Sequence, residues 1–350
     1  MIHYIKESNG VYKVRPKVVV SAQIDPRSLA TLARYAEVVV NATTQPWCRA
    51  ELIDRARDAF GIISFMTDAV DEGLLQRCPS LRIIAGALKG YDNIDVEACT
   101  RHGVWLTVVP DLLTEPTADL TIGLLLALSR NLMEGDRMIR RGEYAGWRPV
   151  LYGTGLRGST VGIAGMGAVG RAIAIRLAGF GCRLIYADDR PLSADDEVAL
   201  GAVRFSMEGI AAECDVLILA LPLTDRTATL IDCQFLSRLK PRCLLINPAR
   251  GSLVDEDAVA DAIEAGRLGG YAADVFAFED IARAGRPQEI PPRLLADLRR
   301  TVLSPHLGSA VETVRSEIVA EAARNIVDCF EGRKPRGAVN AISSTTGPRT

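Results

Sequence analysis

The stretch TVGIAGMGAVGRAIAIRLAGFGCRLIYADD, residues 160–189, is the most specific motif in the chain. A short apolar run that predicts a strand leads into Gly165, Gly167 and Gly170, which have the spacing GxGxxG, and a helical stretch follows. In such a turn the first two glycines let the backbone approach a pyrophosphate, and the third lets the helix pack on the strand. The second predicted strand ends in Asp188, where a carboxylate can accept hydrogen bonds from ribose hydroxyls.

Strand, glycines, helix and acid together predict a dinucleotide-binding site, whereas GxGxxG alone is also compatible with an ordinary glycine-rich loop. Asp188 and Asp189 would repel a 2′-phosphate, so we expect NAD to be preferred over NADP. Arg190 follows them directly and would weaken that preference.

Length and composition narrow the class of protein. The 350 residues are enough for two domains, and 48% hydrophobic with 24% charged residues is typical of a globular protein. A net charge of −2 argues against general binding to nucleic acid or anionic membranes. The eight cysteines form no CxxC pair, which favours reduced thiols in a cytoplasmic protein over a zinc site or a disulfide framework. The longest apolar stretch, LTIGLLLALS (120–129), is too short to span a bilayer. We therefore expect a small-molecule substrate and no metal, nucleic acid or membrane.

Short apolar, β-branched runs alternate with helical stretches along most of the chain. This alternation predicts parallel sheets with helices on both faces. The first set of runs is KVVVS (17–21), AEVVV (36–40), GIISF (61–65), LRIIAGA (81–87) and VWLTVV (104–109), with helices expected over residues 25–36 and 70–78. A long helical stretch from about Thr114 to Arg141 separates this set from a second one, and a helix over residues 309–332 closes the chain. The pattern predicts two doubly wound α/β domains joined by long helices.

Three polar side chains follow strands of the second set. Arg250 ends CLLINPAR (243–250), Glu279 comes shortly after DVF (274–276), and His306 follows TVLSP (301–305). Because open α/β sheets bind ligands beyond the carboxyl ends of their strands, the three would make a sensible set of anion binder, orienting carboxylate and proton carrier. The ordinary alternatives are a solvated strand end for Arg250, a loop-surface charge for Glu279 or Asp274, and a structural histidine. By elimination, since His3 and His102 occupy a terminus and a polar turn, any catalytic histidine would be His306.

Two residues of the first set stand at comparable places. Lys89 follows the run that begins at Leu81, and Met66 follows GIISF. A lysine beside a strand end is usually a surface residue, and a methionine is usually core filler. Position alone therefore assigns no function to either.

The glycine motif, NPARG (247–251), the acid after DVF and SPHLGS (304–309) together resemble the D-specific 2-hydroxy acid dehydrogenase family. The resemblance runs from about Lys17 to Asn340. It implies a flavodoxin-like substrate domain, residues 1–113 plus 307–350, and a Rossmann NAD-binding domain, residues 114–306. It further implies Arg250, Glu279 and His306 as catalytic residues, and a homodimer formed through an arm at about residues 114–157.

A closer resemblance is to the phosphite (phosphonate) dehydrogenase branch of that family. It rests on ALKGYDN (87–93), RHGVWLT (101–107), VPDLLTEPTADL (109–120), GWRPVLYGTGL (146–156), GGYAADVF (269–276) and SPHLGSAV (304–311). The lysine of ALKG separates this branch from most of the family, which carries small or polar residues there. The substrate-binding residues implied are Met66, Lys89, Gly90, Trp147, Tyr152 and Arg250, with Trp147 and Tyr152 contributed by the other subunit. The NAD-binding residues implied are Thr117, Gly165, Gly167, Ala168, Val169, Gly170, Asp188, Ala220, Pro248, Asp274, His306 and Ser309.

This branch implies oxidation of phosphite to phosphate, with hydride transfer to NAD and water as the source of the new oxygen. Lys89 and Arg250 would hold the phosphite oxygens, and His306 with Glu279 would activate the water. The sequence departs from the pattern at Ala277, where related sequences often have an acid, and at Asp280, where hydroxy acid dehydrogenases commonly have proline. Two alternatives stay open: an enzyme of the same fold acting on a 2-hydroxy or 2-keto acid, and an NADH-sensing corepressor that binds proteins. Lys89 argues against the first, and the intact Arg250, Glu279 and His306 argue against the second.

Overall fold

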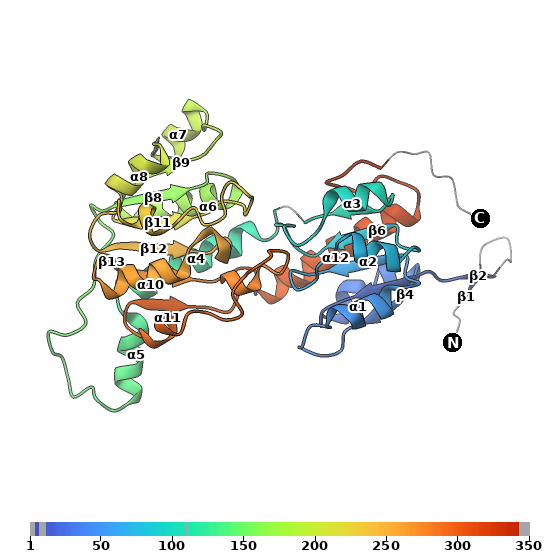
Figure 1. Ribbon diagram of the computed structural model, residues 1–350, viewed down its shortest axis with the longest axis horizontal. Helices are drawn as coiled ribbons and strands as arrows, with labels where there is room; N and C mark the ends of the chain where they lie inside the picture. The colour runs from blue at the N-terminus through green and yellow to red at the C-terminus, as the bar shows by residue number, and fades with distance from the viewer. Residues whose placement is uncertain (1–3, 7–11, 110, 343–350) are drawn as a thin grey trace. The chain divides into compact units, whose positions relative to one another are not determined.

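The computed structural model describes residues 4–6, 12–109 and 111–342 (Figure 1). The chain divides into two compact units. Unit 1 consists of Met1–Leu113 and Val311–Thr350, and unit 2 of Thr114–Ala310. The second junction thus lies after Ala310 rather than after residue 306. In the described part of the chain, no helix is both long and apolar enough to cross a membrane.

Unit 1 is built on a five-stranded parallel sheet with the order β4-β3-β5-β6-β7. Its strands are β3 (Lys17–Val20), β4 (Glu37–Val40), β5 (Gly61–Ser64), β6 (Ile83–Gly86) and β7 (Trp105–Thr107). One face packs on α1 (Arg49–Ala56), α2 (Glu72–Arg77) and α3 (Val96–Arg101), and the other on the long helix α12 (Glu312–Phe330). A short antiparallel pair, β1 (Tyr4–Lys6) and β2 (Tyr12–Val14), precedes the sheet. The strand order is that of a flavodoxin-like sheet.

The prediction of a helix over residues 25–36 was wrong. This segment forms two short 3₁₀ turns, η1 (Pro26–Leu29) and η2 (Leu32–Arg34). A 3₁₀ turn has about three residues per turn, so Leu29 and Leu32, both buried, fall on one side of the segment. The Asp25 carboxylate accepts a hydrogen bond from Arg27 N at 2.9 Å and starts the first turn.

Unit 2 is built on a seven-stranded parallel sheet with the order β10-β9-β8-β11-β12-β13-β14. Its strands are β8 (Thr160–Ala164), β9 (Arg183–Ala187), β10 (Ala202–Arg204), β11 (Val216–Leu219), β12 (Cys243–Asn247), β13 (Leu268–Ala273) and β14 (Thr301–Leu303). One face packs on α4 (Thr114–Ser129) and α6 (Ala168–Leu177), and the other on α8 (Met207–Glu213), α9 (Cys233–Leu236), α10 (Glu256–Glu264) and α11 (Pro292–Ala296). From β8 the chain adds β9 and β10 on one side and then crosses to add β11 on the other, so the order of strands reverses between β8 and β11, as in a Rossmann fold. The two parallel sheets, each covered on both faces, confirm the predicted doubly wound α/β fold.

The helical stretch expected from about Thr114 to Arg141 consists of two helices, α4 and α5 (Leu132–Arg140). Asn131 interrupts it with a left-handed backbone, φ 53°, a conformation that asparagine tolerates better than most residues. Its Nδ2 donates to the carbonyls of Leu151 at 3.2 Å and Tyr152 at 3.3 Å. The break therefore fixes the far end of the irregular segment that follows α5 (Figure 1).

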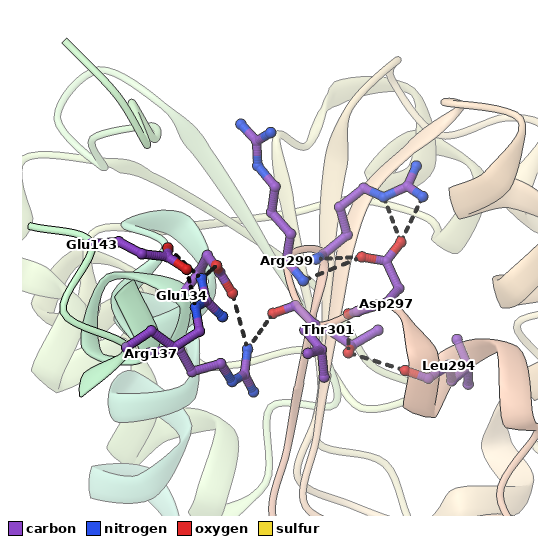
Figure 2. Close-up of polar contacts among 10 residues, drawn as sticks. Glu134, Arg137, Glu143, Leu294, Asp297, Arg299 and Thr301 are labelled. Carbon is purple, nitrogen blue, oxygen red and sulfur yellow. Dashed lines mark hydrogen bonds and ion pairs between the residues drawn. The ribbon is translucent and has the colours of Figure 1, made fainter. Parts of the chain in front are cut away.

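Polar contacts tie α5 to the rest of unit 2 (Figure 2). Arg137 Nη1 donates to Leu298 O at 2.7 Å and lies 3.5 Å from Glu134 Oε2. The Asp297 carboxylate accepts from Arg300 N at 2.8 Å, which shapes the turn before β14. These contacts fix the base of the arm, whereas residues 141–150 are exposed throughout.

Candidate active site

At two positions in the turn after β8, no residue other than glycine fits. Gly165 has φ 96°, and a Cβ there would lie 2.5 Å from Ala220 O. A Cβ on Gly170 would lie 2.1 Å from Gly165 O, so only glycine lets α6 pack this closely. A Cβ on Gly167, by contrast, would meet nothing within 4 Å. The turn thus presents open space directly before the first helical residues, Ala168 and Val169, whose N–H groups have no partner within the helix, and this arrangement fits a pyrophosphate.

Asp188 lies at the end of β9 and is bonded to the glycine turn. Its Oδ2 accepts from Met166 N at 2.7 Å, and its Oδ1 accepts from Arg190 N at 2.8 Å. Together with Asp189 and Arg190 it lines a cavity of about 970 Å³. This is where an adenosine ribose would lie if the glycine turn holds the pyrophosphate.

Two arginines of this cavity were missed from the sequence. Arg204, at the end of β10, donates from Nη2 to Asp188 O at 2.9 Å. Arg226 pairs its Nη2 with Asp189 Oδ2 at 3.0 Å. Only the order of the strands in the folded sheet brings these arginines close to Asp188 and Asp189. No local sequence pattern could therefore have predicted that they line the cavity.

His306 and Glu279 form a hydrogen-bonded pair. His306 Nδ1 lies 2.7 Å from Glu279 Oε2, and Glu279 Oε1 accepts from Phe276 N at 2.8 Å. A carboxylate can only accept, so Nδ1 carries the hydrogen and a neutral ring presents Nε2 as a proton acceptor. Both side chains are partly exposed, which leaves the ring accessible to a small molecule.

The turn that carries His306 is strained and is held by Asp274. His306 has φ 55°, an uncommon conformation for a residue with a side chain, and its N–H donates to Asp274 O at 2.9 Å. The buried Asp274 carboxylate accepts from Leu307 N and Gly308 N, both at 2.7 Å, and from Ser304 Oγ at 2.5 Å. Burial raises the pKa of Asp274, and these hydrogen bonds oppose the rise. Asp274 therefore fixes the backbone on which the histidine stands.

Other predicted residues of unit 2 surround this turn. A Cβ on Gly308 would lie 3.2 Å from both Asp274 Oδ2 and Thr117 Oγ1, so the first turn of α4 contacts the same loop. Ser309 is buried in the loop, Pro248 is buried just after β12, and Ala220 flanks the glycine turn after β11.

Arg250 lies in the loop after β12, ahead of the 3₁₀ turn η4 (Gly251–Leu253). The buried Asn247 donates from Nδ2 to Arg250 O at 2.8 Å, and Arg250 Nη1 donates to Ala249 O at 2.9 Å. This loop packs against the turn η5 (Ala277–Glu279), because a Cβ on Gly251 would lie 1.8 Å from Phe276 C. The structure thus brings Arg250, Glu279 and His306 to one edge of the unit 2 sheet.

Lys89 and Gly90 lie in unit 1, after β6. Leu88 before them is buried, whereas the Lys89 side chain is 37% exposed with Nζ 3.9 Å from Asp111 Oδ1. Burial lowers the pKa of Lys89, and the Asp111 carboxylate partly opposes this effect. The partly desolvated ammonium is a stronger anion binder than a fully hydrated one.

A buried polar network, not anticipated from the sequence, holds the Lys89 loop and the turn that carries Met66. Asn93 Nδ2 donates to Phe65 O at 3.2 Å and to Asp68 O at 2.7 Å. The Asp68 carboxylate accepts from Phe65 N at 2.8 Å and from Ser21 Oγ. These bonds join the segments that follow β3, β5 and β6, and Met66 and Lys89 belong to two of these segments.

Trp147 and Tyr152 lie on the arm, with 80% and 71% of their surfaces exposed. They line an apolar depression of about 450 Å³ together with Leu132 and Ile139. Neither Arg250, Glu279 nor His306 lines this depression.

Glu256, in the first turn of α10, is a buried carboxyl that was not singled out from the sequence. Its Oε1 accepts from Ala277 N at 3.0 Å, and its Oε2 has no hydrogen-bond partner within the described residues. Burial raises the pKa of Glu256 to about 7, and the neighbouring Asp280, Glu279 and Asp257 add to the rise.

Folding stability should depend on the titration of Glu256. Because its folded-state pKa of about 7 exceeds the ordinary 4.5, the folded protein holds this proton more tightly than the unfolded chain. The resulting stabilisation is complete below pH 4.5 and is lost as the pH rises through 7. The loss is on the order of 3 kcal/mol. Urea unfolding between pH 5 and 8 should therefore show a smaller decline for Glu256→Gln than for the wild type. The exposed Glu289→Gln variant should follow the wild type, and identical slopes for all three proteins would contradict the prediction.

Comparisons with known proteins agree with this geometry. Residues 122–308 match the family model for the NAD-binding domain of the D-isomer specific 2-hydroxyacid dehydrogenases. The glyoxylate reductase of Thermococcus litoralis is 34% identical over 340 residues, which cover 96% of this chain and 100% of that protein. The glyoxylate reductase of Aeropyrum pernix is 38% identical over 331 residues, 93% of this chain and 96% of that protein.

A solved structure gives the same fold. The NADPH-dependent glyoxylate/hydroxypyruvate reductase of Sinorhizobium meliloti, crystallised with NADP and malonate, matches with a TM-score of 0.80 and 33% identity, over 93% of this chain and 97% of that one. These three relatives favour the 2-keto acid alternative over phosphite as the substrate.

Proposed function

The chain belongs to the D-isomer specific 2-hydroxyacid dehydrogenase family, and we propose that within this family it oxidises phosphite to phosphate with NAD. Lys89 carries the proposal: a partly buried cation follows a buried strand, in a motif that resembles the phosphite branch. Phosphite is largely a dianion near neutral pH, whereas a 2-hydroxy acid carries one carboxylate charge. A second cation in addition to Arg250 would balance the additional charge of phosphite.

Each side chain then has a defined role. The planar guanidinium of Arg250 binds phosphite oxygens, and the Lys89 ammonium binds another. His306 Nε2 takes a proton from the attacking water, while Glu279 orients the ring and stabilises its charged form. The water oxygen bonds to phosphorus as the P–H bond breaks. NAD, when held by the glycine turn and Asp188, supplies the hydride acceptor.

A second candidate is reduction of glyoxylate or a related 2-keto acid, which the relatives favour. In that reaction Arg250 would bind the carboxylate and protonated His306 would give its proton to the carbonyl oxygen. In this reaction the substrate carries one carboxylate charge, which Arg250 alone balances. Lys89 then has no role in the chemistry.

Absorbance at 340 nm separates the candidates. Purified protein is assayed with NAD and phosphite or a panel of D-2-hydroxy acids, and with NADH and glyoxylate or hydroxypyruvate. We expect the highest kcat/KM for phosphite. No NADH from phosphite, together with efficient glyoxylate reduction, would replace the first candidate by the second.

Cofactor preference should follow the charges around Asp188. We expect kcat/KM to be higher with NAD than with NADP, because Asp188 and Asp189 repel a 2′-phosphate despite Arg190, Arg204 and Arg226. Asp188→Ala should shift the NADP/NAD ratio of kcat/KM by at least about 10-fold towards NADP, since Asp189 alone of the two carboxylates then opposes the arginines. A wild-type enzyme that uses NADP as well as NAD would refute the preference.

The exposed apolar face of the arm supports the proposal of a homodimer. Leu132, Ile139, Trp147 and Tyr152 are each more than half exposed. An apolar cluster of this kind marks a protein contact. Sedimentation equilibrium should show a dimer, and Ile139→Glu should weaken it, whereas the exposed Val198→Glu on α7 (Ala194–Leu200) should not. A fully active wild-type monomer would reject both the dimer and the supply of Trp147 and Tyr152 by the other subunit.

A further inference from the structure

Two loops of unit 2 are packed backbone against backbone. The loop that starts at Arg250 continues through η4 into α10, and the turn η5 ends in Glu279. A Cβ added to Gly251 would lie 1.8 Å from Phe276 C and 2.0 Å from Ala277 N. A side chain at position 251 would therefore push the two loops apart.

Two buried carboxylates bridge these loops in opposite directions. Asp280, directly after η5, accepts through Oδ2 from Ser252 N at 2.8 Å. Glu256, on the arginine side, accepts through Oε1 from Ala277 N at 3.0 Å. Asp280 and Glu256 are only 7% and 4% exposed, so water cannot easily replace these bonds.

The bridge through Glu256 places a carboxyl group in unfavourable surroundings. Burial disfavours the charged form of Glu256, and the nearby carboxyl groups of Asp280 and Glu279 add to this effect. The acceptor for Ala277 N–H is kept in spite of this cost, which points to a requirement for precise backbone placement at the two loops.

We propose that Asp280 and Glu256 are positioning residues that hold the Arg250 loop in register with the Glu279–His306 pair. The inference rests on the proposed roles of Arg250, Glu279 and His306. Ser252 comes two residues after Arg250, so Asp280 acts mainly on the placement of the guanidinium. Ala277 comes two residues before Glu279, so Glu256 acts mainly on the carboxylate that orients His306.

Paired substitutions test each bridge with the substrate that the wild type uses best. Asp280→Ala removes the acceptor for Ser252 N–H, and we expect KM for the substrate to rise at least about 10-fold with kcat falling less than about threefold. Glu256→Ala removes the acceptor for Ala277 N–H, and we expect kcat to fall at least about 10-fold with an altered pH profile. Asp280→Asn and Glu256→Gln keep an acceptor oxygen and should restore both constants to within about threefold of the wild type.

Asp232 provides the matched control. Its carboxylate accepts one backbone hydrogen bond, from Phe235 N at 2.7 Å, at the start of α9. Asp232→Ala should lower stability without the separate effects on KM and kcat. Equal effects of the three alanine variants, or failure of Asn and Gln to rescue, would overturn the proposal. If an alanine variant does not fold, Asp280→Glu and Glu256→Asp replace it, because each displaces the acceptor by one methylene. We then expect Asp280→Glu to raise KM and Glu256→Asp to lower kcat. Wild-type constants in both variants would overturn the proposal.

Hydrogen–deuterium exchange separates this inference from the proposed reaction. Asp280→Ala should speed amide exchange in residues 250–254, and Glu256→Ala in residues 276–280, each at least about 10-fold at constant global stability. If the enzyme does not oxidise phosphite but the variants show this faster amide exchange, the positioning role stands and applies to another substrate. Unchanged exchange in both segments rejects the bridges even if phosphite is oxidised.

Discussion

Replacement of His306 by glutamine is expected to lower kcat by about 10³-fold, in the middle of the range for loss of a general acid–base group. Glutamine can still form a hydrogen bond with Glu279, which lies 2.7 Å from the histidine ring, but it cannot accept a proton from water. NADH binding, measured by fluorescence titration, should weaken far less than kcat falls, since the glycine turn and Asp188 remain and His306 is one of many residues implied to contact the cofactor. Activity at 340 nm then isolates the chemical step.

His102→Gln is the matched control for this prediction. Within the described residues, His102 is the other histidine, and its Nε2 likewise lies next to a carboxylate, 2.6 Å from Glu72 Oε1. Its pairing with Glu72 lies in unit 1, and we expect wild-type kcat. A His306→Gln enzyme that keeps more than about a tenth of kcat would remove His306 from the chemistry. If that variant were inactive yet kept the full biological function, the NADH-sensing binding protein would become the better hypothesis.

The sequence predicted best what depends on neighbours along the chain. Gly165 and Gly170 stand where spacing and strand–helix context place a phosphate-binding turn, and the alternating apolar runs correspond to most strands of both sheets. The edge strand β10 and the hairpin β1–β2 were not anticipated, because their short segments have weak patterns. The break at Asn131 was also missed, because it depends on carbonyls about twenty residues further along the chain.

The candidate site shows the same limit. Arg250, Glu279 and His306 were identified because each follows a strand, and the carboxyl ends of parallel strands meet at one edge. The hydrogen bond from Ser252 N to Asp280 joins residues 28 positions apart. The hydrogen bond from Ala277 N to Glu256 likewise depends on how the two loops pack in the folded chain. An acid in a loop is ordinarily a surface charge, so only its burial in the folded chain distinguishes Asp280.

Replacement of Lys89 by alanine is expected to lower kcat/KM for phosphite by about 10²- to 10³-fold, the usual effect of removing one charge-stabilising donor. The effect should be large because the ammonium is partly desolvated, as its lowered pKa indicates. Reduction of glyoxylate or hydroxypyruvate should change less than about threefold, since a single carboxylate is balanced by Arg250. Both reactions are measured at 340 nm on one preparation.

Lys17→Ala provides the control, since it also removes a partly exposed unit 1 lysine that lies near a carboxylate, here Asp58 at 2.7 Å, but at the start of a strand. It should leave both reactions unchanged, while Lys89→Arg should recover part of the phosphite activity because the charge is kept. Equal losses with both substrates would make Lys89 a general contributor to the site and favour the 2-keto acid reaction. Because the result is a ratio of two activities in the same sample, partial unfolding of the variant lowers both and cannot imitate a selective loss of phosphite oxidation. The selectivity of the Lys89 effect, rather than its size, therefore distinguishes a dianionic substrate from a carboxylate.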